Sequence, residues 1–169
     1  MDPKRLRAAY PQIFPMERLS YEEYIKYSGL FEKGKIYDIA VMLGSAKVKS
    51  VVFSALTLYK RVSSFEFMMA YRLVDIFLGN DESYNSLLQV TPKLLVLVLG
   101  YAGMENRRQE DFIVQVWENQ RMQGNNVWLL CRGSDSKFSK EYPQVNRMLQ
   151  ENGVVRKSLV AETVKVGEI

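Results

Sequence analysis

Six apolar residues in a row, Leu94–Leu99, come directly before Gly100. A strand with one face in water alternates apolar and polar side chains, whereas a strand covered on both faces of a parallel sheet is apolar throughout. Six residues suit a strand and fall far below the ~20 that a membrane-spanning helix requires. The run therefore predicts an inner strand of a parallel sheet with helices on both faces.

The rest of the chain alternates strand and helix patterns around this segment. Strands are expected at residues 36–43, 64–69, 126–132 and 158–166, and helices at residues 20–27, 49–61, 70–78, 105–122 and 139–153. Such alternation with short links is typical of a parallel sheet covered by helices. We expect an α/β protein, a three-layer α/β/α sandwich with a mostly parallel five-stranded sheet. Residues 1–35 are expected to form an N-terminal arm with a short helix, and residues 36–169 the α/β domain.

The helix expected at residues 105–122 has the clearest amphipathic pattern. Its core face is predicted to contain Phe112 and Val116 and, more loosely, Trp117 and Gln120, with Arg107, Arg108, Glu110 and Asp111 facing solvent. We expect Trp117 and Trp128 to be buried rather than stacked on nucleic-acid bases. Cys131, at the end of an expected strand, is predicted to be an inert core thiol.

Composition excludes several kinds of site. The 169 residues include no histidine and one cysteine, Cys131. Nucleophile pairs that depend on histidine, histidine-containing metal sites, CxxC motifs and internal disulfides are therefore excluded. The basic N-terminal stretch has no apolar segment after it, so it does not resemble a signal peptide. We expect a cytoplasmic protein without a membrane span, a metal or a cofactor.

Ligands of parallel α/β proteins bind beyond the carboxyl ends of the strands. After the first expected strand, Gly44, Lys49 and Ser50 resemble a phosphate-binding loop of the form G-x-x-x-x-G-K-[ST]. The loop is one residue short, and Val48 stands where the second glycine should be. Its Cβ opposes positive φ and crowds a phosphate. This segment, which also includes Lys47, is either a degenerate nucleotide loop or a solvated basic turn.

The two other strand ends also lack the residues that nucleotide hydrolysis needs. In nucleotide hydrolases the strand corresponding to Leu94–Leu99 ends in acids that hold Mg²⁺ and orient the attacking water. Here Gly100 and Tyr101 follow the strand. Glu105 comes later and is expected to be a helix N-terminal acid. The strand at residues 126–132 ends in Arg132 and Gly133 rather than in a polar Asn or Thr.

The order of these segments resembles the ATPase core of bacterial replicative-helicase loaders of the DnaC type, a branch of the AAA+ class of P-loop ATPases. In that family two acids end the third strand, a glycine follows, the next helix carries an arginine near its end, and the fourth strand ends in Thr-x-Asn. Gly103 and Arg121 match the glycine and the arginine. The acids and the strand-four tip do not match. The resemblance implies a P-loop-like fold that no longer hydrolyses ATP.

Arg147 lies where such loaders offer an arginine to the ATP of the next subunit. The resemblance implies that it acts in trans on a neighbour's nucleotide. The alternative is a solvated helix residue that pairs with Glu151 four positions later.

The net charge of +4 and the pI near 9.1 permit nucleic-acid contact without requiring it. The basic residues that are candidates for DNA contact are Lys47, Lys49, Lys60, Arg61, Arg132 and Lys137. They either converge at the carboxyl ends of the strands or are scattered solvated charges.

Three functions are compatible with these observations. The first is a non-catalytic protein of DNA replication that contacts a replicative helicase, a loader-like AAA+ protein or single-stranded DNA. The second is an atypical ATPase that uses Lys49 and Ser50 with acids from elsewhere in the chain. The third is an α/β adaptor unrelated to DNA. The sequence does not identify the partner or the oligomeric state. It also leaves open whether the protein activates or inhibits that partner.

Overall fold

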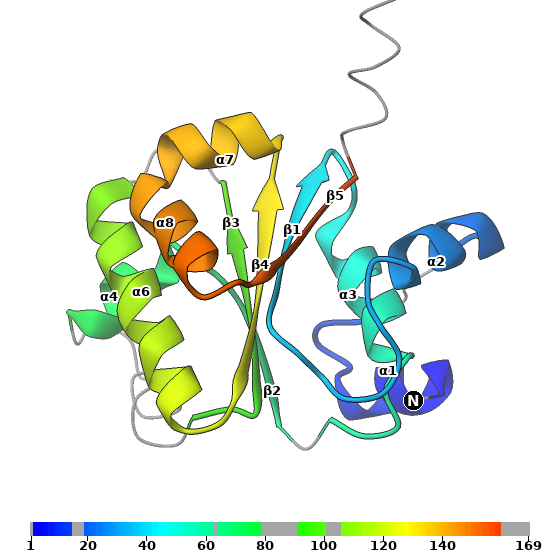
Figure 1. Ribbon diagram of the computed structural model, residues 1–169. Coiled ribbons are helices and arrows are strands. Elements are labelled where there is room, and N and C mark those ends of the chain that lie inside the picture. The colour runs from blue at the N-terminus through cyan, green and yellow to red at the C-terminus, as the bar shows by residue number, and fades with distance from the viewer. Residues whose placement is uncertain (1, 15–18, 63, 79–90, 101–105, 160–169) are drawn as a thin grey trace, which may run out of the picture. The chain divides into compact units, whose positions relative to one another are not determined.

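The computed structural model describes residues 2–14, 19–62, 64–78, 91–100 and 106–159. The chain forms two compact units (Figure 1). Unit 1 consists of Met1–Tyr37 and Ala46–Ser63, and unit 2 of Asp38–Ser45 and Ser64–Ile169. Each unit is described by itself below.

Unit 2 contains a five-stranded sheet whose neighbouring strands are all parallel. The strands are β1 (Ile39–Gly44), β2 (Phe65–Met69), β3 (Leu94–Leu99), β4 (Asn126–Arg132) and β5 (Val155–Ser158), in the order β2-β3-β4-β1-β5. β3 is buried at all six positions, as its continuous apolar sequence predicts. The predicted α/β class and the parallel five-stranded sheet are confirmed.

Four helices pack on one face of this sheet, as the ribbon in Figure 1 shows. They are α4 (Arg72–Phe77), α6 (Asn106–Met122), α7 (Asp135–Glu141) and α8 (Pro143–Glu151). Alternate strand residues such as Leu97 and Leu129 form one apolar core with Ile113, Trp117 and Leu149 from these helices. The predicted burial of Trp117, Trp128 and Cys131 is confirmed.

Two predicted boundaries near the C-terminus are wrong. The single helix expected at residues 139–153 is two helices, α7 and α8, because Pro143 cannot donate a backbone hydrogen bond and disfavours helical geometry at Tyr142. The last strand was expected at residues 158–166, but β5 ends at Ser158. Residues 160–166 of that prediction lie outside the described residues.

The described residues of unit 1 form three helices, α1 (Pro3–Ala9), α2 (Tyr21–Ser28) and α3 (Val48–Leu56). Ser20 caps the start of α2: the backbone N–H of Glu23 donates to Ser20 Oγ, while the Glu23 carboxylate accepts from the backbone N–H of Ser20. Both α1 and α2 contact α3. Phe14 packs edge-on against Phe53, and Thr57 Oγ1 lies 3.0 Å from the Tyr24 hydroxyl. These contacts hold the short helices around α3.

Candidate functional site

β1 and β4 are adjacent, and their connections leave in opposite directions: β1 leads to β2 at one edge of the sheet, while β4 leads to β5 beyond β1. Such a switch point is where open α/β sheets bind ligands. Here Gly44, the last residue of β1, and Gly133, which follows β4, form an antiparallel bridge. Gly44 N–H donates to the Gly133 carbonyl at 3.1 Å, and Gly133 N–H donates back at 3.3 Å. These two amides are therefore used inside the protein.

Gly100 marks the end of β3, where a nucleotide hydrolase places its first acid. Its φ of +96° is rarely adopted by residues with a side chain. A Cβ atom at this position would lie 2.9 Å from the carbonyl oxygen of Arg132, closer than real Cβ contacts allow. The backbone at this strand end thus fits glycine and resists a carboxylate side chain. Tyr101 lies outside the described residues.

A buried tyrosine occupies the space beside Gly100. The Tyr142 hydroxyl accepts a hydrogen bond from Gly100 N–H at 3.2 Å and donates one to Gln109 Oε1 at 3.0 Å. Burial is the main reason why the pKa of Tyr142 is raised, so the hydroxyl keeps its proton at neutral pH. The chain Gly100–Tyr142–Gln109 therefore joins β3, the junction between α7 and α8, and α6.

Glu110 is buried, although the amphipathic pattern predicted that it faces solvent. Its carboxylate accepts the backbone N–H of Val145 at 2.9 Å and also that of Gln144. These are amides of the first turn of α8, whose N-cap residue Tyr142 supplies no side-chain cap. Burial raises the pKa of Glu110 most strongly and neighbouring Asp111 raises it further, while the two backbone hydrogen bonds oppose the shift. Glu110 is thus the cap of a helix remote in sequence.

The residues of the degenerate nucleotide loop divide between the units. Gly44 belongs to unit 2, whereas Lys47, Val48, Lys49 and Ser50 belong to unit 1. Lys47 is the N-cap of α3 and makes no side-chain capping bond. The side chains of Val48 and Ser50 are buried, and those of Lys47 and Lys49 are exposed. Val48, in the place of the missing glycine, is thus a buried apolar residue of the first turn of α3.

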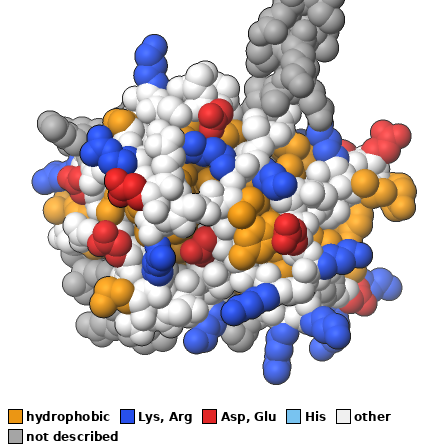
Figure 2. All heavy atoms as spheres, viewed as in Figure 1, with side chains coloured by type: hydrophobic (Ala, Val, Ile, Leu, Met, Phe, Trp, Pro, Cys, Tyr) orange, Lys and Arg blue, Asp and Glu red, His pale blue; other side chains and the backbone are white. Residues whose placement is uncertain are grey.

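The candidate DNA-contact residues do not form one cluster. In unit 1, Lys47 and Lys49 lie at the N-terminal end of α3, while Lys60 and Arg61 follow its C-terminal end. Nine helical residues separate these ends by about 13 Å. In unit 2, Arg132 ends β4, and the aliphatic chain of Lys137 lies over Gly133. Within unit 2, over α6 and α8, Lys and Arg side chains alternate with acids on the face drawn in Figure 2.

Arg147 and Arg121, which the resemblance singled out, differ in their surroundings. Arg147 is exposed on α8, and among the described residues no ion pair joins it to Glu151. Arg121, at the end of α6, donates a hydrogen bond to the side chain of Asn152, the C-cap residue of α8. Arg121 therefore stabilises the junction of two helices, while Arg147 is available to a partner.

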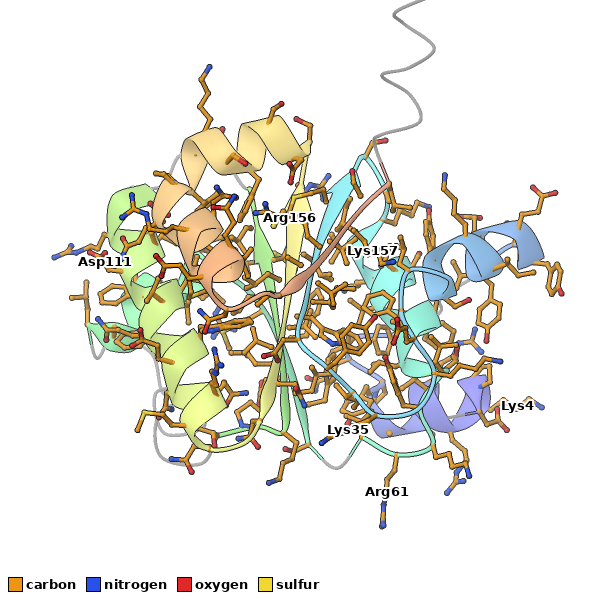
Figure 3. The ribbon with its side chains drawn as sticks, in the orientation of Figure 1. Lys4, Lys35, Arg61, Asp111, Arg156 and Lys157 are labelled. Atoms are coloured by element: carbon orange, nitrogen blue, oxygen red, sulfur yellow. The ribbon has the colours of Figure 1, made fainter. Side chains whose placement is uncertain are left out.

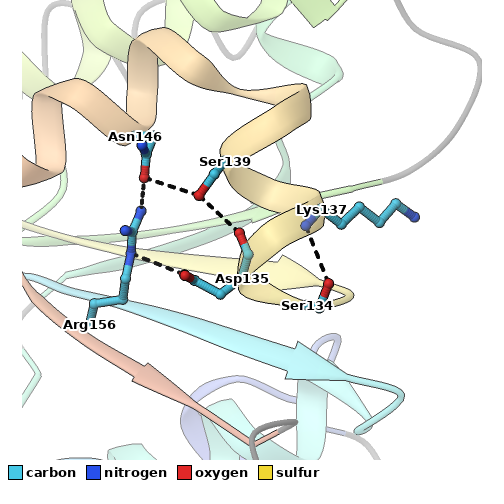
Figure 4. A network of polar contacts seen from close by, with 6 residues as sticks. All are labelled: Ser134, Asp135, Lys137, Ser139, Asn146 and Arg156. Carbon is cyan, nitrogen blue, oxygen red and sulfur yellow. Dashed lines mark hydrogen bonds and ion pairs between the residues drawn. The ribbon is translucent and has the colours of Figure 1, made fainter. Parts of the chain in front are cut away.

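A polar network ties β5 to the helices at the carboxyl edge of the sheet (Figure 4). Arg156 of β5 places Nε 3.5 Å from Asp135 Oδ1 and Nη2 2.5 Å from Asn146 Oδ1. Its guanidinium also lies 5.1 Å from the centre of the Phe138 ring. Arg156 is thus engaged with α7 and α8, so it contributes to packing rather than to an open anion site. Sequence patterns gave no sign of this role.

Neither a family model nor a curated protein matches the sequence. Among solved structures, the chain is similar to a replication initiator DnaA bound to AMPPCP and single-stranded DNA, with a TM-score of 0.45, 14% identity and coverage of 83% of this chain and 45% of that one. It is also similar to a DNA replication initiation factor, with a TM-score of 0.47, 11% identity and coverage of 94% and 47%. The chain therefore spans less than half the length of either structure. Both TM-scores are below 0.5, so the fold assignment rests on the sheet itself.

Two further properties concern the described residues alone. None of their helices is both long and apolar enough to cross a membrane. No three of their Asp, Glu and Cys side chains are grouped as a metal site requires.

Proposed function

We propose that this protein is a non-catalytic relative of helicase-loader ATPases that acts in DNA replication through contacts with a replicative helicase, a loader-like protein or single-stranded DNA. The observation that carries the proposal is Gly100. Its positive φ and the nearby Arg132 carbonyl oppose any acid at the position where hydrolysis of ATP needs one.

Two features of the neighbouring segments support the loss of ATP hydrolysis. Val48, in the place of the second loop glycine, is a buried part of α3 rather than an open turn. Gly44 N–H, at the end of β1, is already bonded to the Gly133 carbonyl. A nucleotide would therefore meet fewer free backbone donors than a phosphate-binding loop provides.

We expect the purified protein to show no ATP turnover above background and to bind Mg-ATP weakly or not at all. Phosphate release from wild-type protein and a titration with a fluorescent ATP analogue would measure both. Steady-state hydrolysis that disappears in Lys49→Ala would contradict the proposal and favour the atypical ATPase. If the protein neither binds nucleotide nor captures a helicase or a loader, the α/β adaptor unrelated to DNA is favoured.

A second prediction concerns Arg147, because its exposed guanidinium suits a role in trans on a neighbour's ATP. Addition of the wild-type protein is expected to change the ATPase rate of an active loader, and Arg147→Ala is expected to abolish that effect. The melting temperature should stay nearly unchanged, since an exposed side chain contributes little to stability. Arg108→Ala, an exposed arginine of α6, is a matched control. Equal effects of wild type and Arg147→Ala would rule out the trans role.

A further inference from the structure

The positive charge of this protein is concentrated in unit 1. Unit 1 contains 11 Lys and Arg against 5 Asp and Glu, a net charge of +6. Unit 2 contains the other 12 basic and 14 acidic residues, a net charge of −2. The whole-chain value of +4 hides this contrast, and such asymmetry is typical of proteins that bind a polyanion with one part of the chain.

Nine of the described basic residues of unit 1 are exposed; besides Lys26, Lys47 and Lys49, six lie on α1 or in the segments that follow α2 and α3. These six are Lys4, Arg5, Lys33, Lys35, Lys60 and Arg61, which we call the basic end of unit 1. Within the described ranges, no ion pair neutralises any of these six side chains. Arg7 is left out of the set because its guanidinium lies 4.9 Å from the centre of the Phe53 ring. The six charges therefore face solvent without a structural use in unit 1.

Contacts inside unit 1 bring the loop that carries Lys33 and Lys35 close to the end of α3. The Tyr37 hydroxyl accepts the backbone N–H of Glu32 at 3.1 Å, which closes this loop. Tyr59, just beyond α3, lies near enough to Tyr37 and Glu32 for both to add to the rise in its pKa that burial causes. Lys60 and Arg61 follow Tyr59 directly. The loop that carries Lys33 and Lys35 therefore lies near the segment that carries Lys60 and Arg61.

α1 adds Lys4 and Arg5 to the same unit. Both lie in its first turn, which contains no acid and where the helix dipole disfavours cations. Figure 3 shows Lys4, Lys35 and Arg61 extending outward from unit 1. Two exposed acids accompany the set, Asp2 and Glu32, so the basic end keeps an excess of positive charge. The two cations in the first turn of α1 lower the stability of this helix, and they add positive charge to the surface of unit 1.

We infer that the basic end of unit 1 binds the phosphate backbone of a nucleic acid. A membrane is the less suitable partner, because a membrane-surface helix needs an exposed apolar face. The one large apolar residue of α1, Leu6, is fully buried, while the exposed Tyr21 and Ile25 lie on α2, which carries none of the six cations. The six residues are all Lys and Arg, so the contacts are with phosphates and carry no base sequence. This inference deepens the proposed function by naming the contact surface, and it depends on the proposed function only for the process in which the contact is used.

The test is a titration of labelled 20-nucleotide single-stranded and double-stranded DNA by fluorescence anisotropy, over a range of salt concentrations and without ATP. For duplex DNA and six contacts, the wild-type affinity should fall on the order of 10³-fold between about 50 and 200 mM salt. The variant Lys33→Ala, Lys35→Ala, Lys60→Ala, Arg61→Ala should bind more weakly and lose only about tenfold over that range. Binding to either form of DNA supports the proposal, and binding to neither overturns it.

A matched variant removes the same charge from unit 2: Lys93→Ala, Arg108→Ala, Lys140→Ala, Lys157→Ala, all at exposed positions. It should keep the wild-type affinity and salt dependence. Equal losses in the two variants, or no loss in either, would overturn the assignment to unit 1. Unlabelled DNA should displace the labelled DNA better than polyglutamate of equal charge does. If polyglutamate competes as strongly as DNA, the preference for nucleic acid is overturned. Because no nucleotide is present, these outcomes are independent of the ATPase assay.

Discussion

Replacing Gly100 by alanine is expected to lower the free energy of unfolding by about 2–4 kcal/mol. A side chain at a φ of +96° costs about 1–3 kcal/mol in backbone strain. The new Cβ would also lie 2.9 Å from the Arg132 carbonyl oxygen, and such overpacking typically costs about 1–3 kcal/mol. For a chain of this length the loss corresponds to a fall in melting temperature of about 5–15 °C. Denaturant titration and thermal melting would measure it.

Gly124 offers the control for this experiment. It has a similar φ of +74°, but a Cβ atom there meets nothing within 4 Å. Gly124→Ala should therefore cost only the strain of the backbone, about 1–2 kcal/mol. If the free energy of unfolding falls equally in both variants, the close approach of the new Cβ to the Arg132 carbonyl does not affect stability. Gly100→Asp should be at least as unstable as Gly100→Ala and should gain no ATPase activity, so one substitution does not restore a catalytic acid.

Glu110→Ala is expected to destabilise the protein by about 2–4 kcal/mol. The substitution removes the acceptor for the Val145 and Gln144 amides, and the loss of a helix cap costs about 1 kcal/mol. A buried amide without a partner adds about 1–3 kcal/mol. Glu110→Gln keeps an acceptor oxygen and should lose less. Equal stability of Glu110→Ala and wild type would show that α8 needs no cap from α6.

The pH dependence separates the charge of Glu110 from its hydrogen bonds. The pKa of Glu110 is raised in the folded state, so the folded protein binds the proton more tightly than the unfolded chain does. The stability of wild type relative to Glu110→Gln should therefore fall as the pH rises from the ordinary glutamate pKa of 4.5 through the raised folded pKa. Asp38, whose pKa burial also raises, titrates in both proteins and cancels in the comparison. A difference that is constant with pH would contradict the raised pKa.

Local sequence patterns predicted the parts of the fold that depend on local physics. The apolar run Leu94–Leu99 is the inner strand β3, and the helix expected at residues 20–27 is α2. The break before Pro143 was missed, although proline disfavours helical geometry at the residue before it. The expected strand at residues 158–166 failed because an edge strand of four residues, exposed at most positions, has little apolar pattern.

The candidate site was less predictable, since its contacts join residues far apart in sequence. Glu110 meets the Val145 amide 35 positions away, and Gly100 meets the Tyr142 hydroxyl 42 positions away. A period of 3.6 residues reports which face of a helix is apolar, and it carries no information about a carboxylate that caps another helix. The absence of an acid at Gly100 was visible in the sequence. The backbone geometry that excludes one was not.

The strand order has a consequence for how the chain acquires its structure. β1 pairs with β4 and β5, which come much later in the sequence. Ile39 is opposite Trp128 on one side and opposite Val155 on the other. Closing such long loops costs entropy before any pairing is gained, and sheets built this way form slowly. During synthesis, the apolar segment Ile39–Gly44 therefore remains without strand partners until most of the chain has left the ribosome. Over that interval it is exposed to aggregation, and a chaperone that shields apolar segments would increase the yield of folded protein.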